Sequence, residues 1–464
     1  MLDRLYSKSR SQFDPFGPIS TPSRAYLAAS SSIPDVIIWL AGRPDAALHP
    51  RSLATHGVFS VQFGSNNDVI PFWTEVARGE TTSTARIFWH DESFLQGRLV
   101  RTIESPTAQG LFITENGVVP VFATIRSLAS LCVDLQYAPT RFEDCACKLP
   151  SRPSTDAAPV HCPSNLEVAA FAIRKLRRSA TLRFNSRGKQ LRWFAALRPN
   201  DGQAITDSAS RNLSGFHEVP LPKGVEQMAD PFLWEADGKQ FLLFEEVSRG
   251  QSRGRLGCVE LAADGSPSEM GIILDRPYHL SYPCVVPENG ELFLLPESAD
   301  SQRVDLYRFV RFPWELELVA SPVTGVMLTD TTPVLIDGLW YFFSTTIEPF
   351  METLLFTSPR LEGPWRLHPA NPVSTSIKNS RSAGNLFWKN ARLFRPTQDC
   401  SVCYGYAITI NEVTRLTPTE FQERPVTHLL PDWMPALEGT HTWNESSRWQ
   451  VIDGLRLVRE SGSL

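Results

Sequence analysis

The chain has 464 residues, of which 42% are hydrophobic and 20% are charged, and its formal net charge is -5. This length predicts two or three domains, and this composition is typical of a folded protein and not of an intrinsically disordered one. The slightly acidic balance argues against a nucleic-acid partner, because domains that bind phosphate backbones are normally basic.

The first thirty residues are polar, are interrupted by Pro15 and Pro18, and contain no apolar core of a secretory signal. Uninterrupted apolar runs such as Val36–Leu40 and Gly117–Ala123 are shorter than the roughly 20 residues that cross a bilayer. We therefore expect no membrane span and a cytoplasmic location.

Eight cysteines in 464 residues are too sparse for a disulfide scaffold, which fits a reducing compartment. Two close pairs, Cys145/Cys147 and Cys400/Cys403, lack the second pair or the neighbouring histidines of a zinc site. The sequence predicts thiols at these positions and no metal site.

Residues 1–137 are expected to form an α/β domain, because apolar runs alternate with helix-like stretches. The expected strands are 35–42, 57–64, 84–90 and 110–114, and one expected helix is 71–79. Residues 138–214 are predicted to be a linker, proline-rich up to Pro163, with an amphipathic helix at 166–180 and a strand at 189–199.

Residues 215–464 contain a repeat. The segments 229–246, 281–298 and 329–346 align without a gap, and each has two short apolar segments around a turn at Gly238, Gly290 or Gly338. Asp-Gly and Asn-Gly are the dipeptides favoured in two-residue hairpin turns. Each segment is therefore predicted to be a β-hairpin.

A fourth unit at 380–399 and a fifth starting near Thr440 complete the series, with Asp230, Tyr282, Asp330 and Ser382 separated by 52, 48 and 52 residues. A period near fifty residues predicts four-stranded propeller blades. We expect an all-β, five-bladed propeller over 215–464; the alternative is an irregular β-sandwich with chance similarity between segments.

Equivalent strand starts of successive blades should converge on one central pocket. This reasoning places a set of polar side chains around one funnel: Asp230, Glu245, Glu246, His279, Tyr282, Glu297, Asp330, Arg381, Asp399 and His441. Four aromatic residues are candidates to stack on a sugar or to fill the blade interfaces: Trp234, Tyr282, Trp340 and Trp443.

Clustered carboxylates suit glycosyl chemistry, because one acid protonates the leaving oxygen while an ionised one activates a nucleophile. Asp230 and Glu297 are predicted to be this acid/base pair, with Asp330 and Glu245 tuning charge or binding sugar hydroxyls. Arg381 is predicted to bind an anionic group such as a nucleotide-sugar phosphate. Alternatively, an aspartate such as Asp230 caps a turn at its strand start.

Several segments carry a resemblance: MADPFLWEADGKQFLLFEE, HLSYPCVVPENGELFLLPES, LEGPWRLHPANPV, RSAG, QDCSVCYG and GTHTW. Over residues 215–455 the chain resembles the N-terminal propeller domain of plant glucosamine inositolphosphorylceramide transferases and their bacterial relatives. It is more distantly similar to family-43 glycoside hydrolases, which use an Asp base, an Asp modulator and a Glu acid. That likeness implies Asp230 as base and Glu297 as acid, whereas Tyr282 stands where the modulator is expected.

Residues 35–99 resemble the formyltransferase domain that uses 10-formyltetrahydrofolate, through the segments DVIIWLAG, GVFSVQFGS, PFWTEVARGETTSTARIFW and FLQGRL. The catalytic Asn-x-His pattern of that family falls here on Ser60 and Gln62, and its Asp on Leu95. Losing these proton-transfer groups implies a degenerate, non-catalytic domain.

The sequence thus predicts a carbohydrate-active protein that transfers a sugar in glycan or glycolipid assembly, with its site in the propeller funnel. Its partner would be a carbohydrate or a nucleotide-sugar donor, and no other cofactor is expected. The alternatives are a glycoside hydrolase of the five-bladed type and a sugar-binding or scaffolding propeller without turnover.

Overall fold

The chain divides into two compact units, Met1–Arg178 and Ser179–Leu464. The computed structural model describes residues 35–39, 54–64, 70–91, 97–107, 113–137, 139, 142–143, 146, 161–185, 189–202, 205–206, 213–347 and 351–459. The pair Cys145/Cys147 and the position Leu95 lie outside these residues, while Cys400 and Cys403 are both free thiols.

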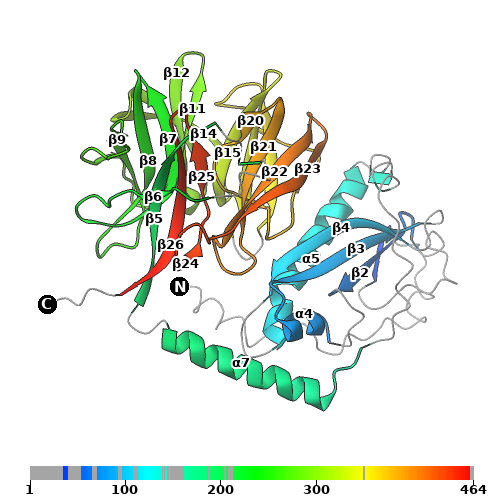
Figure 1. Ribbon diagram of the computed structural model, residues 1–464. Coiled ribbons are helices and arrows are strands. Elements are labelled where there is room, and N and C mark those ends of the chain that lie inside the picture. Colours follow the sequence, from blue (N-terminus) through cyan, green and yellow to red (C-terminus); the bar gives the residue numbers. More distant parts are fainter. Residues whose placement is uncertain are drawn as a thin grey trace. The chain divides into compact units, whose positions relative to one another are not determined.

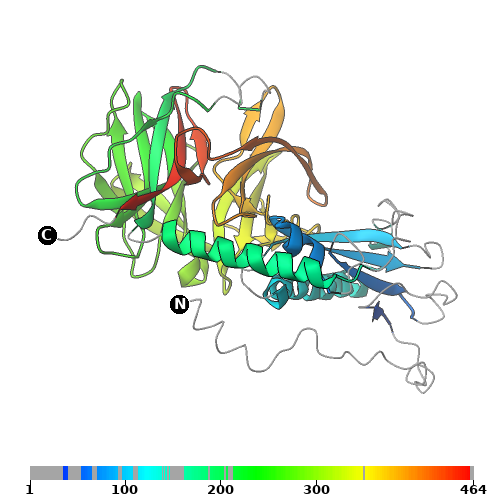
Figure 2. The same cartoon turned by 60° about the horizontal axis from the view of Figure 1, so that its bottom comes forward.

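The first unit contains a four-stranded sheet in the order β1-β2-β3-β4, in which only β1 and β2 pair in parallel. Its strands are β1 (Ile37–Trp39), β2 (Val58–Phe63), β3 (Thr82–His90) and β4 (Arg98–Pro106), and α4 (Trp73–Arg78) connects β2 to β3. Helix α5 (Ile113–Tyr137) packs along β3 and β4 (Figure 2).

Three of the four expected strands of this unit are present, as is the helix at 71–79. Of the strand expected at 110–114, residues 110–112 lie outside the described residues, and the expectation is wrong at 113–114, where α5 begins. Strand β4 was not expected at all. A short continuous run of apolar residues does not distinguish a strand from a segment of a buried helix.

Helix α5 also bears on the membrane prediction. Its segment Glu115–Gln136 has 22 residues and a mean hydropathy of 1.6, so it is long and apolar enough to cross a membrane by length and composition. Uninterrupted apolar runs such as Gly117–Ala123 are shorter than this window, so the prediction of no membrane span did not take it into account. The core helix of a soluble protein passes the same test, so this finding is weak evidence for a span.

The predicted amphipathic helix is confirmed as α7 (Asn165–Asn185). Its first turn is a capping box, in which the Ser164 hydroxyl accepts a hydrogen bond from the Glu167 backbone N–H (3.3 Å) while Glu167 accepts one from the Ser164 N–H (2.8 Å). These bonds satisfy backbone donors that the start of a helix leaves open.

The second unit contains, within its described residues, five antiparallel sheets of four or five strands (Figure 1). Blade 1 contains β7 (Val225–Ala236), β8 (Lys239–Ser248), β9 (Arg255–Leu261) and β10 (Gly271–Leu274). Blade 2 contains β11 (Ser281–Glu288), β12 (Glu291–Glu297), β13 (Arg303–Arg311) and β14 (Glu315–Thr324). Blade 3 contains β15 (Leu328–Ile336), β16 (Leu339–Thr346), β17 (Thr353–Ser358) and β18 (Arg366–Leu367).

Blade 4 contains β19 (Arg381–Ser382), β20 (Phe387–Lys389), β21 (Arg392–Asp399), β22 (Ala407–Leu416) and β23 (Phe421–Leu429). Blade 5 contains β24 (Leu437–Gly439), β25 (Trp443–Glu445) and β26 (Trp449–Arg459), together with β5 (Lys189–Pro199) and β6 (His217–Glu218). The innermost strands contact one another around the ring: β7 with β11, β11 with β15, β15 with β19, and β25 with β7. Blade 4 meets blade 5 where the Trp443 backbone N–H donates to the Ala383 carbonyl at 2.9 Å. The five sheets therefore form the blades of a closed propeller.

Blade 5 is assembled from both ends of this unit. Strand β26 pairs along its whole length with β5, from Trp449 opposite Pro199 to Arg459 opposite Lys189. Because β5 and β6 precede β7, the propeller begins near residue 189, whereas the sequence analysis assigned 138–214 to a linker. Residues 440–464 alone are too few for a four-stranded blade, so the missing strands come from the start of the unit.

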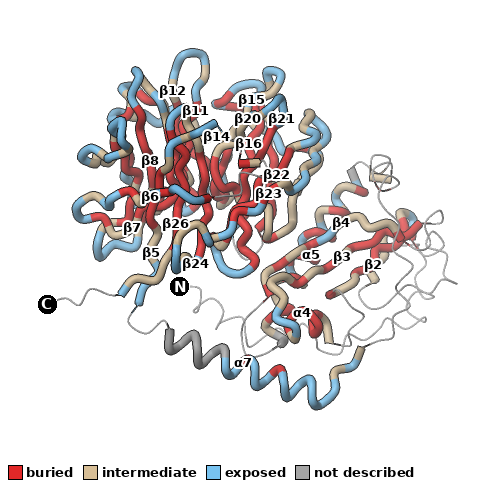
Figure 3. The backbone as a smooth tube through the Cα atoms, in the orientation of Figure 1, coloured by how far each residue is buried: buried red, intermediate tan, exposed pale blue. Residues whose placement is uncertain are grey.

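The predicted hairpin turns are confirmed. Asp237, Asn289 and Asp337 have φ of 49°, 51° and 49°, and the glycine that follows each is also at positive φ. Two successive residues at positive φ define the turn type that matches the twist of paired strands. Burial is concentrated on the inner strands of the blades (Figure 3).

Candidate functional site in the propeller funnel

The backbone repeats the same irregularity in three blades. Asp230, Tyr282 and Asp330 have φ of 47°, 50° and 49°, a conformation that costs free energy for residues other than glycine. Each lies at a break in strand register, between Ala229/Phe232, Ser281/Cys284 and Thr329/Thr332. A β-bulge re-aims a side chain, so three blades present these residues in the same way.

Two of these residues, Asp230 and Asp330, belong to one buried polar cluster. On one side, Arg381 Nε donates to Asp330 Oδ2 at 2.5 Å, and Arg381 Nη2 lies 3.5 Å from Glu297 Oε2. Gln398 Nε2 also donates to Asp330 Oδ2, at 3.2 Å. The Arg381 guanidinium lies 4.8 Å from the ring centre of Tyr404. Blades 2, 3 and 4 therefore meet at this guanidinium.

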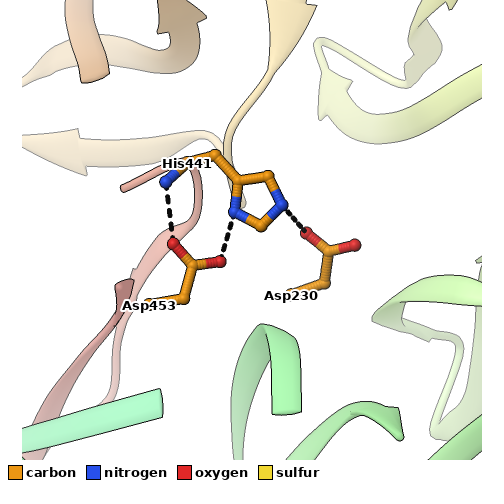
Figure 4. A group of neighbouring side chains, drawn as sticks. All are labelled: Asp230, His441 and Asp453. Atoms are coloured by element: carbon orange, nitrogen blue, oxygen red, sulfur yellow. Dashed lines mark hydrogen bonds and ion pairs between the residues drawn. The ribbon is translucent and has the colours of Figure 1, made fainter. Parts of the chain in front are cut away.

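On the other side, His441 lies between two carboxylates (Figure 4). Its Nδ1 forms an ion pair with Asp453 Oδ2, and its Nε2 lies 3.6 Å from Asp230 Oδ1. The Thr442 hydroxyl donates to Asp230 Oδ1 at 2.7 Å. The imidazole is stacked on Trp193, with ring centres 3.9 Å apart. Blades 1 and 5 meet here.

Glu245 and His279 extend the cluster on blade 1. Glu245 Oε1 lies 3.4 Å from His279 Nε2, and the Gly254 backbone N–H donates to His279 Nδ1 at 3.0 Å. Burial holds the pKa of His279 below its ordinary value. Because Nδ1 accepts a hydrogen bond, the neutral ring carries its proton on Nε2, facing Glu245.

The acids of the cluster differ in protonation. Burial raises the pKa of Glu245 to about 8, with the Asp230 charge adding to the effect. Burial, together with the Asp330 charge, also raises the pKa of Glu297 well above its ordinary value. Burial raises the pKa of Asp230 only to about 6, because the His441 charge opposes it. Near pH 7, these values leave Glu245 mostly protonated and Asp230 mostly ionised.

Other predicted site residues lie elsewhere. Tyr282 is buried in the core, where its hydroxyl accepts a hydrogen bond from the Gly384 N–H at 2.8 Å. Glu246 is paired with Arg255 at 2.8 Å, because neighbouring residues on a strand point to opposite faces. Asp399 lies 3.1 Å from His428; burial alone would raise its pKa, but hydrogen bonds from His428 and Ser401 lower it.

Some residues of the cluster were missed by the sequence analysis, namely Trp193, Gln398, Tyr404, Thr442 and Asp453. Asp453 precedes a glycine and so has the appearance of a turn, yet it lies inside the long strand β26. Trp193 was assigned to the linker. Of the four proposed stacking residues, Tyr282, Trp340 and Trp443 are core residues, and Trp234 packs against the core. Tyr404, which was not proposed, is 40% exposed beside Arg381.

Ligand atoms of Asp230, His441 and Asp453 lie within 4.8 Å of one another, a spacing that could hold a metal ion. Burial would lower the pKa of His441, but the charges of Asp453 and Asp230 outweigh it and raise the pKa to about 9. A protonated imidazole has no lone pair for a metal. The three residues form an ion-paired chain, in which the imidazole would have to release its proton to bind a metal ion.

The fold and the cluster together define a five-bladed β-propeller with buried acid and base groups at its centre. Residues 220–461 match the family model described as "Glucosamine inositolphosphorylceramide transferase 1, N-terminal". The chain belongs to this family. The match confirms the resemblance of the propeller segments; the resemblance of the first unit to formyltransferases stays a prediction.

Proteins similar to this chain include two named glucosamine inositolphosphorylceramide transferase 1. The rice protein (Oryza sativa subsp. japonica) is 34% identical over 243 residues, which are 50% of this chain and 32% of the rice protein. The Arabidopsis thaliana protein is 31% identical over 243 residues, 50% of this chain and 30% of that protein. The chain thus matches about a third of the length of these relatives.

Similar solved structures include Zg3597, a family 117 glycoside hydrolase of Zobellia galactanivorans. It has a TM-score of 0.38 and 11% identity, covering 57% of this chain and 90% of that one. An exo-β-1,3-galactanase of Phanerochaete chrysosporium has a TM-score of 0.36 and 11% identity, covering 47% and 57%. Likeness at this level carries no argument about activity.

Proposed function

We propose that the propeller is a carbohydrate-active domain that transfers a sugar in glycan or glycolipid assembly, with its site in the central funnel. The observation that supports this most is one buried cluster that holds a mostly ionised Asp230, a mostly protonated Glu245, and Glu297, whose pKa burial also raises. Groups whose environments push their pKa values apart are suited to act as base and acid near neutral pH.

In the proposed reaction, Asp230 accepts the proton of the acceptor hydroxyl as its oxygen bonds to the anomeric carbon of the donor. The bond from that carbon to the leaving oxygen breaks, and Glu297 gives its proton to the leaving oxygen. Arg381 is already paired with Asp330 and Glu297. Charge tuning of these acids is therefore better supported for Arg381 than the predicted phosphate clamp.

The relatives suggest which substrates to test. Their printed name indicates transfer of glucosamine to inositolphosphorylceramide, and family membership of residues 220–461 makes this pair the first choice here. Since the match spans about a third of each relative, the activity of the whole relatives comes to this chain only as part of the proposal.

The test uses the full chain with nucleotide-activated glucosamine and inositolphosphorylceramide, and detects the glycosylated lipid by mass spectrometry. Asp230→Asn should lose product formation, commonly 10²–10⁴-fold for removal of a general base. Asp237→Asn is a matched control, because Asp237 is an exposed turn residue with a φ of 49°, close to the 47° of Asp230. Equal activity in the two variants would contradict the proposal.

Hydrolysis is the second candidate, since the same acid and base can serve water as acceptor. Release of free sugar without lipid product, again dependent on Asp230, would select it. Sugar binding without turnover would be selected if ligand binds and neither product forms.

The first unit enters the proposal as a non-catalytic, formyltransferase-like domain. Ser60 stands at one of the expected catalytic positions, and its hydroxyl is hydrogen-bonded to His90 Nε2 at 2.7 Å. Folate-dependent formyl transfer by the chain would overturn this assignment. A cytoplasmic location is also part of the proposal, and cell fractionation tests it.

A further inference from the structure

Asp453 is a buried carboxylate that organises the segment opposite it. It is fully buried in β26, and its Oδ1 accepts hydrogen bonds from the backbone N–H groups of His441 (2.7 Å) and Thr442 (3.0 Å). Its other oxygen pairs with His441 Nδ1 (Figure 4). The Thr440 hydroxyl donates to the Asp453 backbone carbonyl at 2.7 Å. Three consecutive residues are thus anchored on one aspartate.

The anchored imidazole has little freedom to reorient. One of its faces is stacked on Trp193, with an interplanar angle of 14°, and the edge of Tyr404 lies 5.6 Å away between ring centres. Its free nitrogen, Nε2, faces Asp230. With a carboxylate at each ring nitrogen, both nitrogens are stabilised as donors, which is the protonated form of histidine.

We propose that Asp453 is a positioning residue, which holds His441 as a cation against Asp230 and thereby selects Asp230 as the ionised base of the cluster. The assignment of Asp230 as base rests on the proposed function. The ion-paired chain Asp453–His441–Asp230 does not, and it can be tested without a substrate.

The charges around His441 support this selection. Arg381 is the other cation of the described cluster, and it is engaged by Asp330 and Glu297. His441 is ion-paired with Asp453 and Asp230. The charges of this cluster also act on the pKa values of Glu245 and Tyr404. Within the described cluster, removing the His441 charge would leave Asp230 beside the negative charges of Asp330 and Asp453 and without the cation that opposes them. Asp230 would then hold its proton to higher pH.

Nitrogen NMR of the full chain labelled with ¹⁵N-histidine tests the proposal directly. The His441 signal is assigned by its absence in His441→Gln. At pH 7 the wild-type signal should show two protonated ring nitrogens. In Asp453→Asn, which keeps the size of the side chain, the midpoint of His441 titration should fall by about 1–3 pH units. Asp275→Asn is the control, because Asp275 is paired with Arg253 on the surface of blade 1.

A neutral His441 in the wild type at pH 7 would overturn the proposal, and so would an unchanged titration in Asp453→Asn. If Asp453→Asn does not fold, His441→Gln provides the second measurement: ¹³C NMR of the aspartate carboxyls should show the midpoint of Asp230 moving upward by about 1–3 pH units. An unmoved Asp230 would refute the link. Loss of sugar transfer with normal titrations would instead count against the proposed function alone.

Discussion

Arg381 offers a direct test of how the cluster is held together. The Arg381 side chain is 12% exposed, and its partners Asp330 and Glu297 are 1% and 10% exposed. Replacing Arg381 by Met keeps the length of the side chain but removes the cation. Two neighbouring buried acids then lose the charge that stabilises their ionised forms.

Removing one partner of a buried ion pair typically costs about 3–5 kcal/mol. We expect about 3 kcal/mol for Arg381→Met, because protonation of Glu297 recovers part of the loss. For a unit of this size that free energy corresponds to a fall in Tm of about 6–12 °C.

The loss should depend on pH in a defined direction. Without Arg381, the folded-state pKa of Glu297, which burial already raises, rises further above its unfolded value. The stability that depends on protonated Glu297 is then retained at low pH and is lost as the pH rises. The fall in Tm should therefore be larger at pH 8 than at pH 5.

Thermal unfolding followed by circular dichroism at both pH values measures the effect. Arg311→Met is the control, since the Arg311–Glu315 pair is 67% and 53% exposed and such pairs contribute little. A Tm of Arg381→Met equal to that of the control at both pH values would refute the reasoning.

Three other variants test separate contacts. The pKa of Glu245 is raised to about 8 from an ordinary value of 4.5, so its stabilising contribution is complete below pH 4.5 and is lost as the pH rises through about 8. Glu245→Gln should therefore flatten the decline of Tm between pH 5 and 9 in thermal-shift assays. An unchanged slope would count against the raised pKa of Glu245. Thr442→Val removes the 2.7 Å hydrogen bond to Asp230 and should raise the Asp230 pKa in ¹³C NMR, whereas a lowered pKa would contradict the assignment. A Cβ on Gly384 would lie 2.1 Å from the Trp443 carbonyl oxygen at a φ of 127°, so Gly384→Ala should cost about 3 kcal/mol or more in urea unfolding. Gly325→Ala, with φ of 78° and no atom within 4 Å, should cost about 1 kcal/mol; equal losses would exclude the steric explanation.

The repeat was predictable because it depends on local chemistry. Asp-Gly and Asn-Gly turns require positive φ, and this requirement is visible in the sequence at Gly238, Gly290 and Gly338. The same spacing placed Asp230 and Asp330 in one cluster. The bulges that aim these two residues inward depend on strand pairing, which no local signal records.

What the sequence did not reveal depends on contacts between distant segments. Strand β5 completes blade 5 by pairing with β26, about 250 residues later. The local sequence predicted the strand correctly, but its assignment to a linker was wrong, because no local signal indicates this distant pairing. Asp453 has the appearance of a turn residue because Gly454 follows it, whereas in the structure it pairs with Ala195 of β5. Glu246 was included with Glu245 although adjacent strand residues face opposite sides.

The central claim is that the funnel binds a sugar through the carboxylates that the blades bring together. A thermal-shift screen of nucleotide sugars against the wild type, Asp230→Asn and Asp237→Asn tests it most directly. A ligand at one hundred times its Kd adds about 2.7 kcal/mol, or about 5–10 °C in Tm. We predict that a stabilising sugar loses its effect in Asp230→Asn and keeps it in Asp237→Asn; full stabilisation of Asp230→Asn would contradict the account.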